Sequence, residues 1–445
     1  MRYNSDSLPG DLNRFYTFGH SGGGAQSCLM GITGNSDLFN DYLNDIGAAM
    51  QDSSGNTIKD NIKGSQCWCP ITNLDTADAA YEWNMGQYFS TNTRASGTFT
   101  KALSNDLISE FVTYINALKL KDPDGNELTL TSTNAGTYYD YLKSVIEESL
   151  NNFISDTSFP YTPSGNSEGG NPGGGNFNPG EGGAGGTPPD FPGSNLRHLD
   201  TYNIADDYIS SLNSDKEWIT KDSSGNYKFS SVEDFVTHCK SASKSVGAFD
   251  DLSKSQAENK LFGIDGTTYA KHFDSIMAKL LINNADTYSS LSNWDSNYPN
   301  DYTNDLSVTN YLGKTIEERA KMYNPMYYLH SYYAGYKTSD VADYFRINSG
   351  ITQSDTSNVV EMNLFLALNN YGKNVKFTTV WEQGHTEAER SGSATDNFIS
   401  WIAEIEGVSD SSSEDSSSSG NSNSNGSFFK IKVSSCLICI FILFL

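Results

Sequence analysis

The chain has 445 residues, enough for one large domain or two ordinary ones. Its formal net charge is −25, from 29 basic and 54 acidic residues, and it has no basic run, so we expect no nucleic-acid partner. Only 37% of the residues are hydrophobic but 12% are aromatic, so tyrosine and phenylalanine are expected to supply much of the core.

The first chemical signature is a serine between glycines at 19–23, Gly-His-Ser-Gly-Gly. The apolar run at 14–18 predicts a strand before it, and the small and apolar residues at 25–31 predict a helix after it. Strand, glycine-flanked serine and helix, in this order, form the nucleophile elbow of an α/β-hydrolase. Ser21 is therefore the candidate nucleophile.

The elbow makes demands on the residues around the serine. Gly19 and Gly23 are expected to be required because the backbone is strained there and its neighbours pass close by. The Gly22 amide is placed to donate a hydrogen bond to a developing oxyanion. His20 is the variable residue of the motif and is expected to line the substrate pocket. An accidental match in a chain rich in glycine and serine is the alternative.

Only 20 residues precede Ser21. An α/β-hydrolase lays down several strands before its elbow, and a preceding loop donates the second oxyanion amide. We therefore expect that an N-terminal segment, with any signal peptide, is missing from this chain. The strand at 14–18 is then expected to lack partners on one side, which would be an aggregation hazard.

Residues 1–72 form the first part of the predicted hydrolase core, with a helix expected at 37–50 and a strand at 65–72. Residues 73–330 do not alternate strand and helix, and they are predicted to be a mostly helical cap over the elbow. Helices are expected in this insertion at 101–118, 136–154, 202–212, 231–245 and 268–282. A flexible loop rich in glycine and proline is expected at 162–197.

The core resumes at 331–408. Strands are predicted at 341–348 and 375–381, and helices at 358–371 and 394–405. His385 directly follows the last of these strands. The order Ser, Asp, His along the chain is the one that an α/β-hydrolase requires, so His385 is the candidate general base.

The end of the chain is predicted to lie outside the folded core. Residues 409–432 form a serine-rich, solvated linker, and residues 433–445 form an uncharged, mostly apolar tail. The tail is shorter than the roughly 20 residues of a spanning helix. It matches a GPI-anchor signal; a short tail anchor or translated non-coding sequence are the alternatives. We therefore expect an extracellular or cell-surface protein, attached to a membrane if the tail is an anchor.

Taken together, the motifs identify a family. The chain resembles the bacterial tannase-type α/β-hydrolase esterases over nearly everything from Leu8 to Ile405. The resemblance is carried by the elbow and by separated blocks in the family order, at 8–11, 69–74, 79–83, 118–120, 248–250, 258–263, 324–326 and 384–385.

The resemblance implies roles for particular residues. Ser21 would attack an ester carbonyl, His385 would take and return the proton, and the Gly22 amide would be one oxyanion donor. In the family, a lysine, a glutamate and an aspartate contact the phenolic hydroxyls of the galloyl group. The matching positions here are Lys244, Glu258 and Asp355.

One departure from the family pattern concerns the triad acid. The family loop reads Asp-x-Asp-Thr-Ser, and its first aspartate is the acid. Here the loop at 353–357 begins with Gln353, which carries no negative charge. Asp355 is the only carboxylate of the loop, so we expect it to serve as the acid, which puts its role as a galloyl contact in doubt.

The sequence thus predicts an α/β-hydrolase-fold serine esterase with a helical cap. It would act on a small-molecule ester of a plant phenolic acid and need no cofactor or metal ion. A generic carboxylesterase of the same fold is one alternative. A truncated, non-catalytic surface protein is the other.

Overall fold

The computed structural model describes residues 2–7, 10–90, 92–163, 201–263, 269–408 and 438–441. Nearly all of the predicted glycine-rich loop 162–197 and the whole of the predicted linker 409–432 lie outside the described residues.

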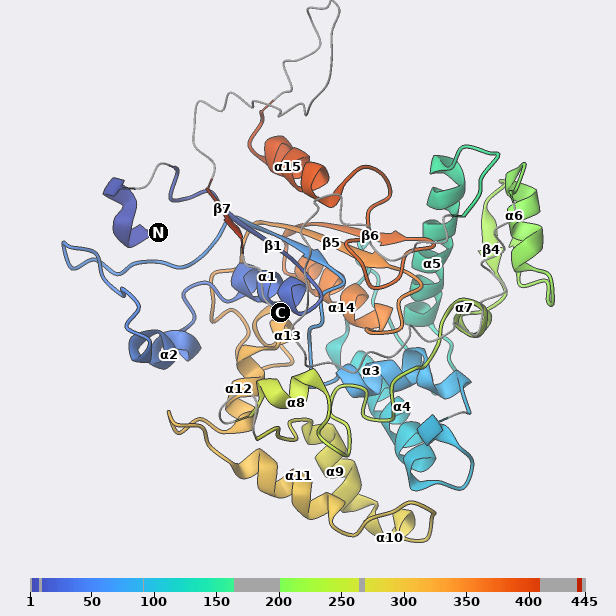
Figure 1. Ribbon diagram of the computed structural model, residues 1–445, viewed down its shortest axis with the longest axis horizontal. Coiled ribbons are helices and arrows are strands. Elements are labelled where there is room, and N and C mark those ends of the chain that lie inside the picture. Colours follow the sequence, from blue (N-terminus) through green and yellow to red (C-terminus); the bar gives the residue numbers. More distant parts are fainter. Residues whose placement is uncertain are drawn as a thin grey trace, which may run out of the picture.

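A parallel β-sheet forms the centre of the fold (Figure 1). Its strand order is β6-β5-β2-β1-β7, and every neighbouring pair is parallel. The strands are β1 (Phe15–His20), β2 (Gly64–Trp68), β5 (Tyr344–Gly350), β6 (Asn374–Val380) and β7 (Ile438–Phe441). Four of these strands were predicted with bounds shifted by a few residues. The fully buried β2 is typical of a parallel sheet covered on both faces.

Helices cover the two faces of the sheet (Figure 1). On one face, α1 (Gly22–Ile32) packs on β1 and β2, and α14 (Asn358–Asn370) packs on β5 and β6. On the other face, α15 (Ala394–Ile405) buries its apolar side chains against Tyr16 and Trp68.

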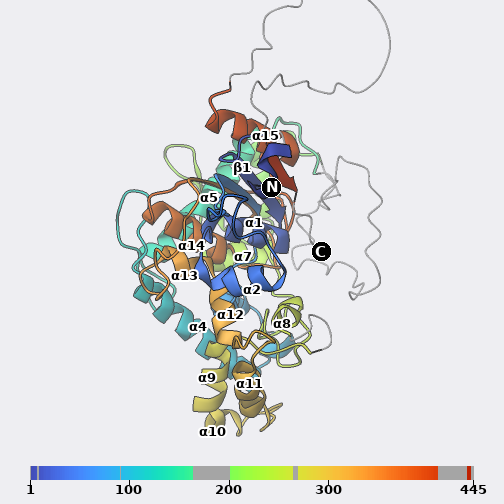
Figure 2. The same ribbon diagram turned by 90° about the vertical axis from the view of Figure 1, so that its left-hand side faces the viewer.

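The segment between β2 and β5 is mostly helical, and much of it extends away from the sheet (Figure 2). Only a short antiparallel hairpin, which the sequence did not predict, interrupts the helices that the structure describes there. The division into core and cap stays a prediction. The elements are α3 (Ala77–Asn84), α4 (Phe99–Leu118), α5 (Thr137–Asp156), α6 (Ala205–Leu212), β3 (Ile219–Lys221), β4 (Tyr227–Phe229), α7 (Val232–Cys239), α8 (Ala257–Leu261), α9 (Ser275–Asn283), α10 (Ala285–Tyr288), α11 (Tyr298–Ser307), α12 (Ile316–Met322) and α13 (Pro325–Leu329), with single-turn 3₁₀ helices at Gly86–Tyr88 and Asn92–Arg94.

Two predictions near the ends of the chain need correction. The helix expected at 37–50 is a 3₁₀ turn (Asp37–Phe39) followed by the short α2 (Asn40–Asp45). The predicted open edge of β1 is covered by β7, whose register runs from Phe15↔Ile438 to Phe18↔Phe441. Part of the predicted tail is therefore a sheet strand, and the GPI anchor stays a prediction. None of the described helices has both the length and the apolar character to cross a membrane.

The turn after β1 is strained and tightly packed. Ser21 has φ 59° and ψ −123°, a backbone conformation that L-residues rarely adopt. A Cβ on Gly19 would lie 2.1 Å from the Gly23 carbonyl oxygen, and a Cβ on Gly24 would lie 2.8 Å from the Trp68 carbonyl oxygen. A Cβ on Gly23 would meet nothing within 4 Å. The close approaches therefore require Gly19, as predicted, and Gly24 rather than Gly23.

We predict that Gly19→Ala destabilises the fold by more than about 3 kcal/mol, because the new methyl group overlaps backbone atoms that cannot move aside. The matched variant Gly23→Ala should stay within about 1 kcal/mol of the parent, since alanine is the better helix former. Thermal unfolding followed by circular dichroism measures both. Equal melting temperatures for the two variants would contradict this packing of the turn.

Candidate active site

The parallel register of the sheet brings the predicted site residues together. His20 ends β1 and pairs with Trp68 of β2, which pairs with Asn348 of β5. The carboxyl ends of parallel strands meet at one edge of a sheet, where α/β proteins place their ligands. The segments that follow β1, β2, β5 and β6 carry Ser21, Cys69, Gln353 with Asp355, and His385.

Ser21 is held between two strands at the start of α1. Its amide donates to the Trp68 carbonyl oxygen at 2.9 Å, and its own carbonyl accepts from Ala25 at 2.9 Å. The serine side chain does not cap the helix, and the Gly22 that follows is exposed. The Ser21 hydroxyl and the first helix amide therefore both stay available for a substrate, as nucleophile and oxyanion donor require.

His385 lies in the loop that follows β6. This loop passes so close to β5 that a Cβ on Gly350 would lie 1.8 Å from the Gly384 carbonyl oxygen. Nδ1 of His385 lies 2.7 Å from Oε1 of Gln353. Because that oxygen can only accept, Nδ1 carries the proton and Nε2 keeps its lone pair. His385 therefore has the tautomer of a general base. No hydrogen bond joins His385 to Ser21 in the structure; in hydrolases without substrate this bond is often long and forms fully only in the substrate complex.

The expectation that Asp355 takes the place of the triad acid is not met. Gln353 itself, at the family's acid position, occupies Nδ1 of His385, and Asp355 is exposed. The Asp355 charge still acts on the site, since it opposes the lowering of the pKa of both His20 and His385. Asp355 is therefore a charged neighbour of the histidines, and its role as a substrate contact stays a prediction.

The electrostatics of the site keep His385 neutral. Burial lowers the pKa of His385 to about 4, with smaller lowering effects from His20 and Lys244 and an opposing effect from Asp355. Burial also lowers the pKa of His20. At neutral pH the His385 imidazole is thus the free base that can take a proton from serine.

A buried polar network lies behind Gln353, and no pattern in the sequence predicted it. Gln353 Nε2 donates to Glu361 Oε1 of α14 at 2.7 Å and to Ser349 Oγ at 2.9 Å. The backbone carbonyl oxygen of Gln353 accepts from Nζ of Lys240 at 2.6 Å. Burial raises the pKa of Glu361 to about 7 and lowers the pKa of Lys240 to about 7. Two ionisable groups therefore stand directly behind the catalytic loop.

The predicted substrate contacts differ in how firmly the structure connects them to the site. The backbone carbonyl of Lys244 accepts from Nη1 of Arg94 at 3.0 Å, and Arg94 is held by the buried Glu82 with Nε–Oε2 of 2.8 Å. Lys244 Nζ lies 4.2 Å from the centre of the Phe249 ring, and its charge acts on His385. Glu258 lies half-buried on α8, without a hydrogen bond or ion pair to the other site residues among those described.

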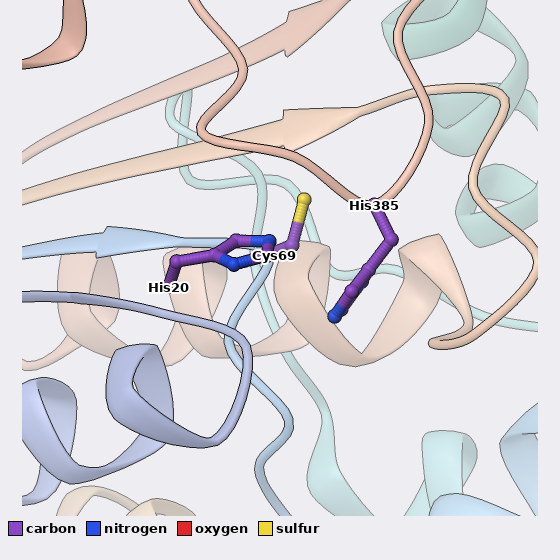
Figure 3. Close-up of side chains that lie close together, drawn as sticks. All are labelled: His20, Cys69 and His385. Carbon is purple, nitrogen blue, oxygen red and sulfur yellow. The ribbon is translucent and has the colours of Figure 1, made fainter. Parts of the chain in front are cut away.

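One set of side chains in the described part of the chain could hold a metal ion, although the sequence predicted none. His20, Cys69 and His385 each offer a donor atom, and these atoms lie within 4.8 Å of one another (Figure 3). Nε2 of His20 is buried without a hydrogen-bond partner. Imidazole and thiolate together suit Zn²⁺ or softer ions. Burial raises the pKa of the Cys69 thiol, which opposes thiolate formation. A metal ion there would occupy the His385 ring and block its action as a base.

Comparison with solved structures finds the same fold in tannases. A tannin acyl hydrolase from Lactobacillus plantarum is 26% identical, with a TM-score of 0.55, over 91% of this chain and 68% of its own. The Fusobacterium nucleatum tannase is 26% identical, with a TM-score of 0.59, over 90% of this chain and 69% of its own. A tannin acyl hydrolase in complex with ethyl gallate is also 26% identical, with a TM-score of 0.53, over 91% of this chain and 68% of its own.

No protein-family model and no curated protein sequence matches the chain. The structural matches nevertheless confirm the predicted α/β-hydrolase fold and the resemblance stated from the sequence blocks. They do not assign roles to individual side chains, so the site residues rest on the geometry above.

We predict that the pKa of His385 responds in opposite directions to its two charged neighbours. Asp355→Asn should lower it further, because the carboxylate favours the imidazolium, and Lys244→Gln should raise it, because the ammonium disfavours it. NMR titration of histidine-labelled protein measures both shifts. His330, whose pKa is lowered by burial in the helical segment, is the internal control. Shifts of the same sign in both variants would contradict this placement of the charges.

Proposed function

We propose that this chain, which resembles tannases in its α/β-hydrolase fold, is a serine esterase acting on esters of phenolic acids. An ester-hydrolysing activity follows from the likeness to tannases at the level of the family. The serine mechanism and the phenolic substrate are the parts that we add. The observation that carries the mechanism is the strained Ser21 at the start of α1, on the same sheet edge as a neutral His385.

The proposed reaction has two halves. Ser21 Oγ attacks the ester carbonyl while His385 Nε2 takes the hydroxyl proton, and the Gly22 amide donates to the oxyanion. The C–O bond to the alcohol then breaks, His385 returns the proton to the leaving oxygen, and an acyl-enzyme remains. Water repeats the sequence on the acyl-enzyme and releases the acid.

The charges around His385 support a hydroxylated aromatic acyl group. Lys244 and Asp355 both act electrostatically on His385, and we infer that an acyl group held beside His385 comes within their reach. A lysine can donate to a phenolic oxygen and a carboxylate can accept from a phenolic hydroxyl. A substrate without those hydroxyls would leave the charges without partners. Two tannin acyl hydrolase structures contain ethyl gallate and 3,4-dihydroxybenzoate.

A generic carboxylesterase is the second candidate. It is favoured by Glu258, for which no hydrogen bond or ion pair to Lys244, Asp355 or His385 is found among the described residues. A site that contacts the ring hydroxyls with two charged side chains discriminates less against esters without hydroxyls than a site with three such side chains.

We predict that the protein hydrolyses ethyl gallate and that Ser21→Ala abolishes the activity, since the variant has no nucleophile. Ethyl benzoate, the matched ester without ring hydroxyls, should have a kcat/KM lower by at least about 100-fold. Product release measured by chromatography decides both points.

Lys244→Met keeps the length of the side chain and removes its charge. It should therefore reduce the ratio of kcat/KM for ethyl gallate to kcat/KM for ethyl benzoate. Equal turnover of both esters by the parent protein would favour the generic carboxylesterase. Turnover that survives Ser21→Ala would contradict the assignment of the nucleophile.

A further inference from the structure

The histidine of a serine hydrolase becomes positively charged when it takes the serine proton, and an anion beside it stabilises that charge. Gln353 holds the acid's position but has no charge to offer. Asp355 favours the imidazolium, but it is exposed, so solvent screens its attraction. An esterase built on this chain would therefore gain from a second, buried negative charge close to its histidine.

We propose that Glu361 supplies this charge, as a positioning residue that acts on His385 through the side chain of Gln353. The inference rests on the proposed esterase function. Two hydrogen bonds of equal length connect the groups, from His385 Nδ1 to Gln353 Oε1 at 2.7 Å and from Gln353 Nε2 to Glu361 Oε1 at 2.7 Å. Gln353 and Glu361 are each at most 1% exposed, so no water competes for these bonds.

Glu361 first determines which way the Gln353 amide faces. An amide can turn either its oxygen or its NH₂ group toward His385, whereas an ionised carboxylate only accepts. Oε1 of Glu361 therefore accepts a hydrogen bond from the NH₂ group of Gln353, and Oε1 of Gln353 then faces His385 and accepts from its Nδ1. The second carboxylate oxygen accepts from the Ser349 hydroxyl, so both oxygens of Glu361 are used. This arrangement selects the His385 tautomer with a free Nε2.

Glu361 also supplies the field that the amide lacks. Its carboxylate is separated from the imidazole by one side chain, so its attraction for an imidazolium is weaker than that of an acid in direct contact. The interior screens this attraction less than water would. With Gln353 inserted between the histidine and the acid, the triad keeps a negative charge that stabilises the imidazolium, but less strongly than an acid in direct contact would.

The protonation of Glu361 is set by the groups packed around it. Four neighbours favour the carboxylate form of Glu361 and so lower its pKa. Three of them act through side-chain hydrogen bonds (Ser349 of β5, Gln353 and Asn358), and Lys240 acts through its charge. Lys240 is itself fully buried, and Cys69, Cys239 and Asp355 also act on it. Burial outweighs these effects and raises the pKa of Glu361 to about 7. Glu361 therefore becomes an anion only as the pH rises through about 7, whereas His385 is already neutral above about 4.

The test uses p-nitrophenyl acetate and a fluorophosphonate probe, which report on serine activation without knowledge of the natural ester. Glu361→Gln should lower kcat by about 10- to 100-fold with little change in KM, and it should slow probe labelling equally. The parent's kcat should fall below a pH of about 7. Glu361→Gln should lose this limb, so that its remaining activity falls only near the pKa of His385.

The double variant Gln353→Glu/Glu361→Gln exchanges the acid and the amide while it keeps their size, number and net charge. It should recover at least the parent kcat, because the anion then contacts His385 directly. Gln353→Glu alone places two carboxylates in contact, where they must share a proton, and should be less active than the double variant. Near-ultraviolet circular dichroism compares the folds of all three.

An unchanged kcat and an unchanged acidic limb in Glu361→Gln would overturn the inference. So would a double variant that is folded but no more active than Glu361→Gln alone. The proposed esterase function fails separately, if the parent protein neither turns over the ester nor reacts with the probe at Ser21.

Discussion

The site depends on the common register of β1, β2, β5 and β6, which brings four loops that are far apart in sequence to one edge of the sheet. The loops come together only because the backbones approach more closely than side chains would allow. Gly24 lies against the carbonyl of Trp68, the last residue of β2, and Gly350 lies against the Gly384 carbonyl before His385. In this way the packing of the strand ends fixes the positions of Ser21 and His385, the proposed nucleophile and base.

Local sequence patterns predicted those parts of the fold that are formed by consecutive residues. The strand, glycine-flanked serine and helix around Ser21 could be predicted because an elbow is built from consecutive residues. The place of His385 could be predicted because it lies in the loop that follows a strand with a clear apolar pattern. Gly24 was missed in favour of Gly23, since the atom that it approaches, the Trp68 carbonyl oxygen, lies 44 positions further along the chain and no local rule points to it.

The partners of His385 could not be read from the sequence for the same reason. Choosing Asp355 over Gln353 assumed that the loop would turn its only carboxylate toward the histidine. The structure instead keeps Asp355 in solvent and buries Gln353, because Glu361 and Ser349, on α14 and β5, satisfy the glutamine amide. A glutamate eight positions further along and a lysine 113 positions earlier have no spacing that marks them as one network. The pairing of β7 with β1 is a long-range contact of the same kind.

A triad acid does two separable things, which this site distributes over two residues. It orients the imidazole and fixes its tautomer, for which any acceptor at Nδ1 suffices, and the Gln353 oxygen is such an acceptor. It also stabilises the imidazolium, for which a charge is required. In a buried site that charge need not touch the ring, since an amide between them transmits orientation by hydrogen bonding while the low dielectric preserves attraction over the added distance. Burial is the condition for this arrangement, and burial also makes the charge hard to form, as the raised pKa of Glu361 shows. In a triad lengthened by an amide, the carboxylate therefore stabilises the imidazolium less strongly, and this stabilisation depends on pH near neutrality.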